Sequence, residues 1–552
     1  MKHRPVNSDA DALSSLAKSE VRSRGVLKVG ADFYILASSV AGRRETRSLV
    51  NGEGFAVVDA SGDIIGSPIE ELGFFYADTR HLSSFELRVN GKSPCFLNSY
   101  VANDRAELCV NLTNPDLTDD AETVILPRDS VQIERRCSIA GDALFQQISL
   151  RNFARDRIDL QLDFLVSADF SDLFEVRGVR RKQRGRMLEP AAANGQIKFC
   201  YQGLDTVERS STVTFNPPPH SLAVNSAGYQ LELEPGAATV IECRISAKIE
   251  NAGARPAGKP LGFDEALTAR RNELKELRTG WATITASDES FDSLLTSSAA
   301  ALASLVSNRA DGTFIMAGIP WFATLFGRDS LITAMAMLPY YPAIAKRTLQ
   351  TLAHFQGTRI DTAREEQPGK IVHEIRTGEM AAIGEVPFGR YYGSVDATPL
   401  FLWLLGEYVA TTGDISLAST LWPNVERALE WIDQFGDADG DGYVEYCRET
   451  PRGLANQGWK DSFDAISHAN GALARPPIAL AELQGYVYAA YVTLSDVSAR
   501  LGFDGTAIGL TVKAATLKEN FLRDFWTAED GLVALALDAD KRPCRVMTSN
   551  GA

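Results

Sequence analysis

The sequence predicts a chain of two parts, an antiparallel β-sandwich followed by a toroid of α-helices. In residues 26–250, short apolar segments alternate with polar residues and are separated by turn residues, a pattern typical of antiparallel sheets with one solvated face. After Pro256 and Pro260 the apolar residues recur with a helical period, and long polar loops join the segments. Because no β-α-β alternation occurs, neither a Rossmann domain nor a TIM barrel is expected.

The clearest strand patterns support the sandwich. Ile158–Phe164 and Tyr229–Glu234 alternate strictly between apolar and polar residues, and many short strands with turn residues between them are typical of this fold. Residues 1–25 are polar and of mixed charge without an apolar core. We therefore expect a flexible N-terminus there and not a signal peptide.

The second part begins after a linker. Residues 251–285 are expected to be a helical linker with a charged helix over Glu265–Arg278, and residues 286–552 are expected to form the toroid. The loops between the helices would carry the functional residues. The helical period predicts helices at Phe291–Val306, Ser330–Met337, Ala343–Gln356, Thr398–Thr412, Ile415–Phe435, Ile478–Leu501 and Thr511–Asp524.

Composition limits the classes of partner. The 552 residues carry a net charge of −15, which argues against a nucleic acid or an anionic membrane surface as partner. The seven cysteines form no Cys-x-x-Cys pair, so we expect reduced thiols, no zinc site and a cytoplasmic location. No apolar run reaches the length of a membrane span. No cofactor is expected, and the sequence leaves open whether the chain forms a homo-oligomer.

Gly318–Ser330 is the most informative segment. It places Trp321 and Phe322 shortly before Arg328 and Asp329, where a loop enters a predicted helix. Aromatic faces stack on the CH faces of a sugar, and charged groups form strong hydrogen bonds with its hydroxyls. The alternative is structural: Asp329 or the following serine caps the helix, and Arg328 sits in an ion pair.

Three further loops carry similar groups. A paired set of carboxyl groups beside aromatic rings is what glycoside cleavage requires, since one carboxyl protonates the leaving oxygen and another activates water. The alternatives are a structural histidine and a plain helix cap at the aspartate that opens a helix. The candidates for substrate binding are His373, Glu374, Arg376, Asp396, Trp459, Lys460 and, on a predicted helix, Gln484.

Asp461 is the candidate for the catalytic acid. Trp459 and Phe463 flank it, and an apolar wall raises the pKa of a carboxyl group toward the range of a general acid. Lys460 would oppose this if it faced inward, so we expect it to point elsewhere.

Several motifs resemble those of a known family in their order along the chain. The chain from Leu27 to Ala552 resembles the bacterial glycogen-debranching-type amylo-α-1,6-glucosidases, and Gly73–Leu82 looks like part of the N-terminal domain of that group. The motifs are Gly318-Ile-Pro-Trp-Phe, Gly327-Arg-Asp-Ser, His373-Glu-Ile-Arg, Ser394-Val-Asp-Ala and Gly458-Trp-Lys-Asp-Ser.

The resemblance implies an (α/α)6 barrel of the glucoamylase clan that cleaves α-glucosides with inversion. It implies that Arg328 and Asp329 bind hydroxyls of the non-reducing glucose. It also implies that Asp461 is the general acid, although the family has Trp-Met-Asp where this chain has Trp459-Lys460-Asp461.

Such a barrel needs twelve helices by this resemblance, and the sequence predicts about seven after Ser287. From typical helix and loop lengths, about 100 residues would be missing. We therefore expect a C-terminally incomplete toroid whose general base lies beyond Ala552.

Two other functions stay open. The first is an α-glucoside phosphorylase, which uses phosphate in place of activated water. The second is a carbohydrate-binding protein without catalysis.

Two charged segments have structural and functional readings. Arg177–Arg186 carries six basic residues and is expected to be a solvated loop. Asp437–Asp441 resembles the start of a calcium-binding loop, but its twelfth position is Arg448 instead of glutamate, so a Gly/Asp-rich turn without metal is the favoured reading.

Overall fold

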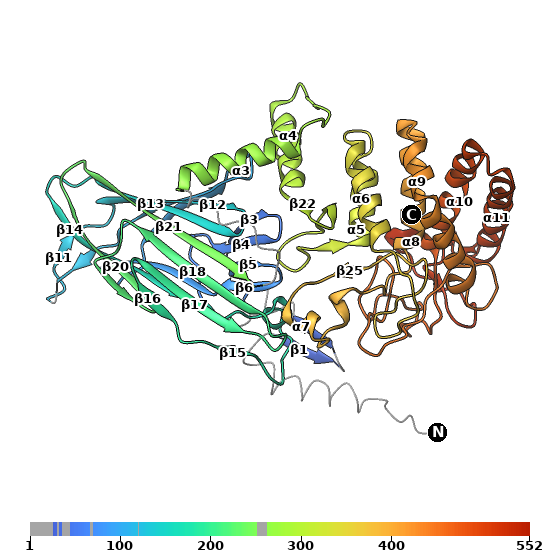
Figure 1. Ribbon diagram of the computed structural model, residues 1–552, viewed down its shortest axis with the longest axis horizontal. Helices are drawn as coiled ribbons and strands as arrows, with labels where there is room; N and C mark the ends of the chain where they lie inside the picture. Colours follow the sequence, from blue (N-terminus) through green and yellow to red (C-terminus); the bar gives the residue numbers. More distant parts are fainter. Residues whose placement is uncertain are drawn as a thin grey trace. The chain divides into compact units, whose positions relative to one another are not determined.

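The computed structural model describes residues 26–29, 32–35, 45–66, 70–119, 121–250 and 262–551. They form two compact units, Met1–Lys275 with Gly378–Met380, and Glu276–Thr377 with Ala381–Ala552 (Figure 1). The division between the units falls inside helix α3, Phe263–Leu277. The expected flexible N-terminus, residues 1–25, lies outside the described residues.

The first unit is built from antiparallel sheets (Figure 1). The largest has the strand order β15-β17-β18-β21-β13-β12-β9-β8, with β16 paired to β17, and two four-stranded sheets have the orders β19-β20-β14-β7 and β3-β4-β5-β6. The large sheet comprises β8 Cys95–Val101, β9 Leu108–Thr113, β12 Val131–Ala140, β13 Ala143–Asn152, β15 Arg186–Met187, β16 Ala191–Ala193, β17 Gln196–Gln202, β18 Glu208–Asn216 and β21 Ala238–Ile249. The smaller sheets comprise β3 Thr46–Asn51, β4 Gly54–Asp59, β5 Gly73–Tyr76, β6 Thr79–Leu82, β7 Ser84–Val89, β14 Ile158–Ser167, β19 Ser221–Ala223 and β20 Ser226–Leu233. Short two-stranded pairs add β1 Val26–Val29 with β2 Asp32–Ile35 and β10 Leu117–Thr118 with β11 Val124–Leu126.

Side chains that alternate along β14 form the core between two of these sheets. Ile158, Leu160, Leu162, Phe164 and Val166 are buried, while Asp159, Gln161 and Leu165 are exposed. Phe164 of β14 contacts the rings of Phe85 and Phe215, with ring centroids 5.6 and 5.5 Å apart. Since Phe215 belongs to the large sheet, the predicted antiparallel sandwich is confirmed.

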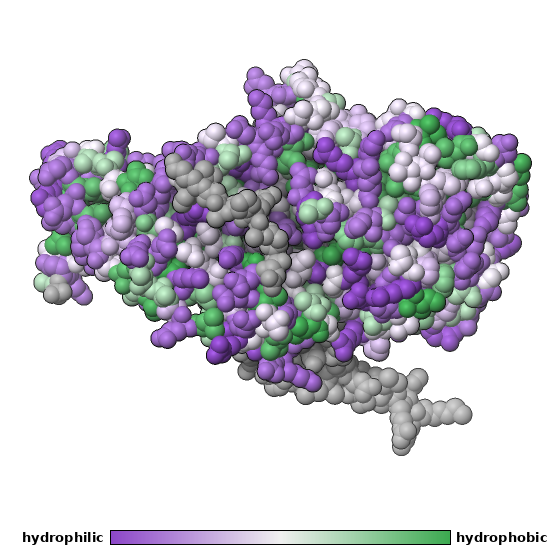
Figure 2. Space-filling model, in the orientation of Figure 1, coloured by the Kyte–Doolittle hydropathy of each residue, from purple (hydrophilic) through white to green (hydrophobic). Residues whose placement is uncertain are grey.

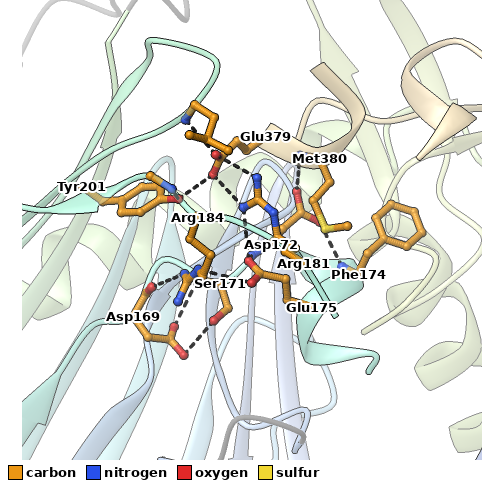
Figure 3. Close-up of polar contacts among 12 residues, drawn as sticks. Asp169, Ser171, Asp172, Phe174, Glu175, Arg181, Arg184, Tyr201, Glu379 and Met380 are labelled. Atoms are coloured by element: carbon orange, nitrogen blue, oxygen red, sulfur yellow. Dashed lines mark hydrogen bonds and ion pairs between the residues drawn. The ribbon is translucent and has the colours of Figure 1, made fainter. Parts of the chain in front are cut away.

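The short segment Gly378–Met380 belongs to the first unit because its polar groups are bound there (Figure 3). Glu379 accepts two hydrogen bonds from Arg181, at 3.1 and 3.0 Å, and one each from the Tyr201 hydroxyl and the Leu204 amide, both at 2.8 Å. Burial raises the pKa of Glu379, but Arg181 and the other donors outweigh it and hold the pKa below its usual value.

Most of the basic segment Arg177–Arg186 is solvated, as the charge run predicted, because Arg177, Arg180, Lys182, Arg184 and Arg186 are exposed. Arg181 is the exception. The Arg181 side chain is only 1% exposed, and Arg184 pairs with Glu175 at 3.2 Å. Glu175 completes a capping box with Asp172 at helix α2, Leu173–Val176. Arg181 is buried because Glu379, which is distant in the sequence, and the nearby Glu175 supply partners for it inside the fold.

The second unit consists mainly of antiparallel helix pairs (Figure 1). Helix α5 packs on α6, α8 on α9 and α10 on α11, while α8 also contacts α5 and α10. Buried residues occur all along α8, which places this helix inside the unit. The helices are α4 Glu289–Ser304, α5 Gly327–Met337, α6 Pro342–His354, α8 Ala397–Thr412, α9 Ile415–Trp431, α10 Ala481–Leu501 and α11 Asp504–Asp524.

The predicted helices agree with these bounds, except that α11 begins at Asp504 instead of Thr511. Two glycines near its start made the helix pattern weak in the sequence. The structure compensates through contact with α10, because the Ser495 hydroxyl donates to the Ala507 carbonyl at 2.9 Å. Among the described residues, no helix is long and apolar enough to cross a membrane.

Helices α4 and α11 expose apolar side chains. Phe291 and Leu294 on α4 are 51% and 59% exposed, and Ile508 on α11 is 67% exposed. On the face shown in Figure 2, hydrophobic and hydrophilic groups are interspersed. Exposed apolar faces on helices are what an incomplete toroid would leave, and the incompleteness itself stays a prediction.

The Glu379 cluster gives a stability prediction for the first unit. Glu379→Gln leaves the buried Arg181 without its bidentate carboxylate, and we expect the free energy of unfolding of this unit to fall by about 3 kcal/mol. Urea unfolding followed by circular dichroism measures the change.

The matched control is Glu232→Gln, which removes an exposed ion pair with Arg157 and should cost at most about 1 kcal/mol. Equal losses in the two variants would contradict a stabilising role for the buried pair.

Candidate functional site

Arg328 at the start of α5 joins three loops of the second unit. Its Nη1 donates to Asp396 Oδ2 at 3.1 Å and to the Gly458 carbonyl at 2.6 Å, and its Nη2 donates to Asp461 Oδ2 at 3.3 Å. The guanidinium carbon also lies 5.6 Å from the centroid of the Trp459 ring. The structure thus brings together four residues that the sequence named as candidates.

Gly327 allows this approach. A Cβ atom there would lie 2.1 Å from the Val372 carbonyl oxygen, so no other residue fits without moving the backbone. Strand β24, Leu325–Phe326, pairs with β25, Glu374–Ile375, and the Gly327 amide donates to the His373 carbonyl at 2.8 Å. The short pairing and the glycine together direct Arg328 into the site.

Asp396 is not a plain helix cap, although it precedes α8. Its side chain makes no capping hydrogen bond. One carboxylate oxygen accepts from Ser394 at 2.6 Å and the other accepts from Arg328. Its side chain is 2% exposed, so the ion pair with Arg328 is largely shielded from water.

The site holds an excess of carboxylates. Burial lowers the pKa of Arg328, but Asp396, Asp329 and Asp461 outweigh it and raise this pKa. Burial raises the pKa of Asp329, and Arg328 partly offsets this. The start of α5 has no side-chain cap, so Asp329 does not act as the predicted alternative cap.

Aromatic rings stand beside these charges with their surfaces open. Trp459 is 50% exposed and Phe322 is 41% exposed, while Trp321 is half-buried. Asp461 shares this exposure, since 45% of its side chain is accessible. An accessible carboxyl group next to open aromatic faces can meet a sugar ring from solvent.

His373, Glu374 and Arg376 lie behind the aromatic loop. His373 packs edge-on against Phe326 and Tyr391, with centroid distances of 5.5 and 5.8 Å. Burial, and then the nearby cations, hold its pKa well below its usual value, so it is neutral. Arg376 donates to Glu374 at 3.0 Å and to the Trp321 carbonyl at 2.7 Å, which fixes the position of the aromatic loop.

Gln484 is bound to the protein backbone. Its amide nitrogen donates to the carbonyls of Val444 and Leu480 at 2.7 and 3.1 Å, and its oxygen accepts from the Val444 amide at 3.0 Å. These bonds anchor α10 to the preceding loop.

Glu482 is a site residue that the sequence reading missed. Among the described residues, neither of its buried carboxyl oxygens has a hydrogen-bond partner. A Cβ atom on Gly458 would lie 3.8 Å from Glu482 Oε1. Burial raises the pKa of Glu482 to about 7; Asp396 adds to this, while Asn550 and Lys460 lower it. The sequence pattern that could have identified Glu482 is an acidic residue where a loop enters a helix, as at Asp329 and Asp396.

A lysine pairs with two of the three aspartates in the Asp437–Asp441 loop. Carboxylate oxygens of Asp437, Asp439 and Asp441 lie within 4.8 Å of one another. Lys541 Nζ lies 2.8 Å from Asp439 and 2.6 Å from Asp441, and it also pairs with Glu445 at 2.8 Å. This ammonium group brings one positive charge to the acidic loop, and the metal-free turn stays a prediction.

Comparison with known proteins gives a family match for part of the first unit and a fold match for most of the chain. Residues 49–244 match the family described as the N-terminal domain of (some) glycogen debranching enzymes. No curated protein matches the chain.

Solved structures define the fold of nearly the whole chain as glucoamylase-like. A protein from the human microbiome assigned as a kojibiose phosphorylase is similar, with a TM-score of 0.53, 10% identity, and coverage of 89% of this chain and 69% of that chain. A bacterial glucoamylase complexed with acarbose has a TM-score of 0.51, 11% identity, and coverage of 89% and 73%.

Glu482 makes stability depend on pH. Its folded pKa of about 7 lies above the usual 4.5, so the folded state holds this proton more tightly than the unfolded state. The stabilisation is full below about pH 4.5 and is lost as the pH rises to about 7. Glu482→Gln should therefore be more stable than the wild type by roughly 2–3 kcal/mol at pH 8 and nearly equal near pH 4.5.

Thermal melts across this pH range measure the difference. The exposed Glu519 on α11 provides the control, since Glu519→Gln should leave the pH dependence unchanged. A constant difference between Glu482→Gln and the wild type at all pH values would rule out this titration.

Proposed function

We propose that the second unit cleaves α-glucosidic bonds as an inverting, amylo-α-1,6-glucosidase-like glycoside hydrolase. One observation carries the proposal: Arg328 holds Asp396 and Asp461 together beside the exposed Trp459. The debranching-type N-terminal domain and the glucoamylase-like fold support it.

The geometry suggests a division of roles. Asp329, with Arg328, hydrogen-bonds the hydroxyls of the glucose ring, and Trp459 and Phe322 stack on it. Asp396 positions Arg328, because both of its oxygens already accept hydrogen bonds. Trp321 is held by Arg376 and Glu374, so these residues and His373 shape the aromatic wall. We assign no direct sugar contact to Gln484, because backbone groups occupy its amide.

Asp461 acts as the general acid in this proposal. Its proton passes to the glycosidic oxygen as the bond to the anomeric carbon breaks, and the carboxylate that remains is stabilised by Arg328. Water attacks the anomeric carbon from the opposite face and gives its proton to a base, which yields the inverted free sugar. The positive charge of Lys460 lowers the pKa of the neighbouring Glu482.

A phosphorylase is the second candidate, favoured by the similarity to the protein assigned as a kojibiose phosphorylase. In that reaction phosphate replaces water as the nucleophile, and no general base is needed. The same Asp461 would protonate the leaving oxygen.

Product analysis separates these functions. Maltose, isomaltose and a branched limit dextrin are incubated with and without phosphate, and the anomer formed is followed by NMR. β-Glucose without phosphate supports the hydrolase, and a sugar phosphate supports the phosphorylase. Sugar binding without any product would favour a non-catalytic protein.

The proposal predicts different effects at two carboxylates. Asp461→Asn should lower kcat about 10³-fold with little change in KM, because the proton donor is lost. Asp329→Ala should raise KM and lower kcat together, since a hydroxyl contact is lost in both substrate and transition state. Initial rates over a range of substrate concentrations measure both.

Asp464→Asn is the matched control, because this exposed aspartate lies in the same loop and should leave both constants nearly unchanged. An Asp461→Asn variant with near-normal kcat would remove Asp461 from the acid role.

A further inference from the structure

A cavity lies in the same unit and shares two segments of the chain with the candidate site. Its volume is about 340 Å³, which is within the range of small-molecule sites. Val395 and Gln457 line it, while the next residues, Asp396 and Gly458, contact Arg328. The Val395 amide donates to the Gln457 carbonyl at 3.0 Å, so the two segments form one wall shared by cavity and site.

Lys370 lines this cavity, and its ammonium group makes fewer hydrogen bonds than it has donors. The residue is 5% exposed, and within the described part of the chain its Nζ has one hydrogen-bond acceptor, the Glu365 carbonyl at 3.4 Å. Its other contact is the Trp431 ring, at 5.7 Å. An ammonium group has three donors, and burial without partners costs free energy. Burial accordingly lowers the pKa of Lys370, although Glu365 and Glu449 oppose this.

Acceptors with unused capacity line the same cavity. Glu445 is 4% exposed, and its buried Oε1 has no hydrogen-bond partner among the described residues, while Oε2 pairs with Lys541. Glu449 accepts from Gln367 through Oε1 at 2.8 Å. The side chains of Trp431 and Phe435 complete the lining with apolar surface.

These groups select for one ligand chemistry. Glu365, Glu445 and Glu449 line the cavity together with Lys370, and Lys541 pairs with Glu445. The acidic side chains outnumber the ammonium groups, so an anion would be repelled. A neutral ligand rich in hydroxyl groups can accept from Lys370 and donate to the carboxylates, and its CH groups can lie on the aromatic wall.

We propose that this cavity is a second carbohydrate site, which takes one neutral sugar unit next to the candidate active site. The proposal does not require the second unit to cleave glycosides. Glu365, whose backbone φ is +52°, accepts a hydrogen bond from Gln457. A sugar held by Lys370 therefore also fixes the segment whose Gly458 carbonyl binds Arg328.

Cys447 offers a direct test, because this exposed cysteine lines the cavity. The unmodified protein is labelled with iodoacetamide in the presence of D-glucose or maltose, and peptide mass spectrometry gives the labelling rate. At a sugar concentration of about ten times Kd, the rate at Cys447 should fall about tenfold. Cys95, an exposed cysteine in β8, is the internal control and should react at an unchanged rate.

Two variants assign the protection to its site. Lys370→Met keeps the apolar stem and removes the ammonium group, and it should abolish protection; the control Lys346→Met, at a partly exposed lysine paired with Asp414, should not. Arg328→Met disrupts the candidate active site and should leave protection intact, even if no glycoside is cleaved by the wild type.

Three results would overturn the proposal. The first is an unchanged Cys447 rate with either sugar at saturating concentration. The second is protection that survives in Lys370→Met but disappears in Arg328→Met, which would locate the sugar in the candidate active site. The third is protection by inorganic phosphate and not by sugars, which would make the cavity an anion site.

Discussion

The buried guanidinium of Arg328 is the interaction on which the candidate site depends. Its acceptors belong to residues 68, 130 and 133 positions away in the sequence. A buried cation must have such partners, because its desolvation is not otherwise offset. Asp396 anchors one side of the guanidinium, and Asp461 meets the other side from a more exposed loop. The same contact therefore shapes the fold locally and places a carboxyl group where a substrate can reach it.

Charge compensation recurs at other points of the molecule. Inside the first unit, Glu379 accepts hydrogen bonds from Arg181, the Tyr201 hydroxyl and a backbone amide. In the second unit, Lys541 forms ion pairs with the acidic Asp437–Asp441 loop. In each case a group that looks like a functional or solvated charge in the sequence is used to hold backbone segments in place. At Glu482 and Lys370 the buried polar groups lack a full set of hydrogen-bond partners. Such groups are candidates for a functional role and not only for a structural one.

The candidate site and the cavity, which share residues 395–396 and 457–458, differ in character. On the Arg328 side, open aromatic rings and an accessible carboxyl group face solvent. On the Lys370 side, donors and acceptors line an apolar-walled cavity. Because both share one backbone, occupation of either would restrict the same loop.

The sequence alone determined the sandwich, the helices and much of the site. Period-two and helical patterns depend on local geometry, so β14 and the helices α5, α6, α8, α9 and α10 could be placed without tertiary information. The loop-to-helix position of Arg328 and the aromatic residues beside Asp461 were also local signals. The tertiary structure decided the rest. It places Glu482 at the site, while Gln484 binds backbone groups. It also pairs Lys541 with the acidic loop, buries Arg181 against Glu379 and places Lys370 in the lining of a cavity. These contacts join residues far apart in the chain, and burial, which sets their partners and pKa values, exists only after the chain has folded.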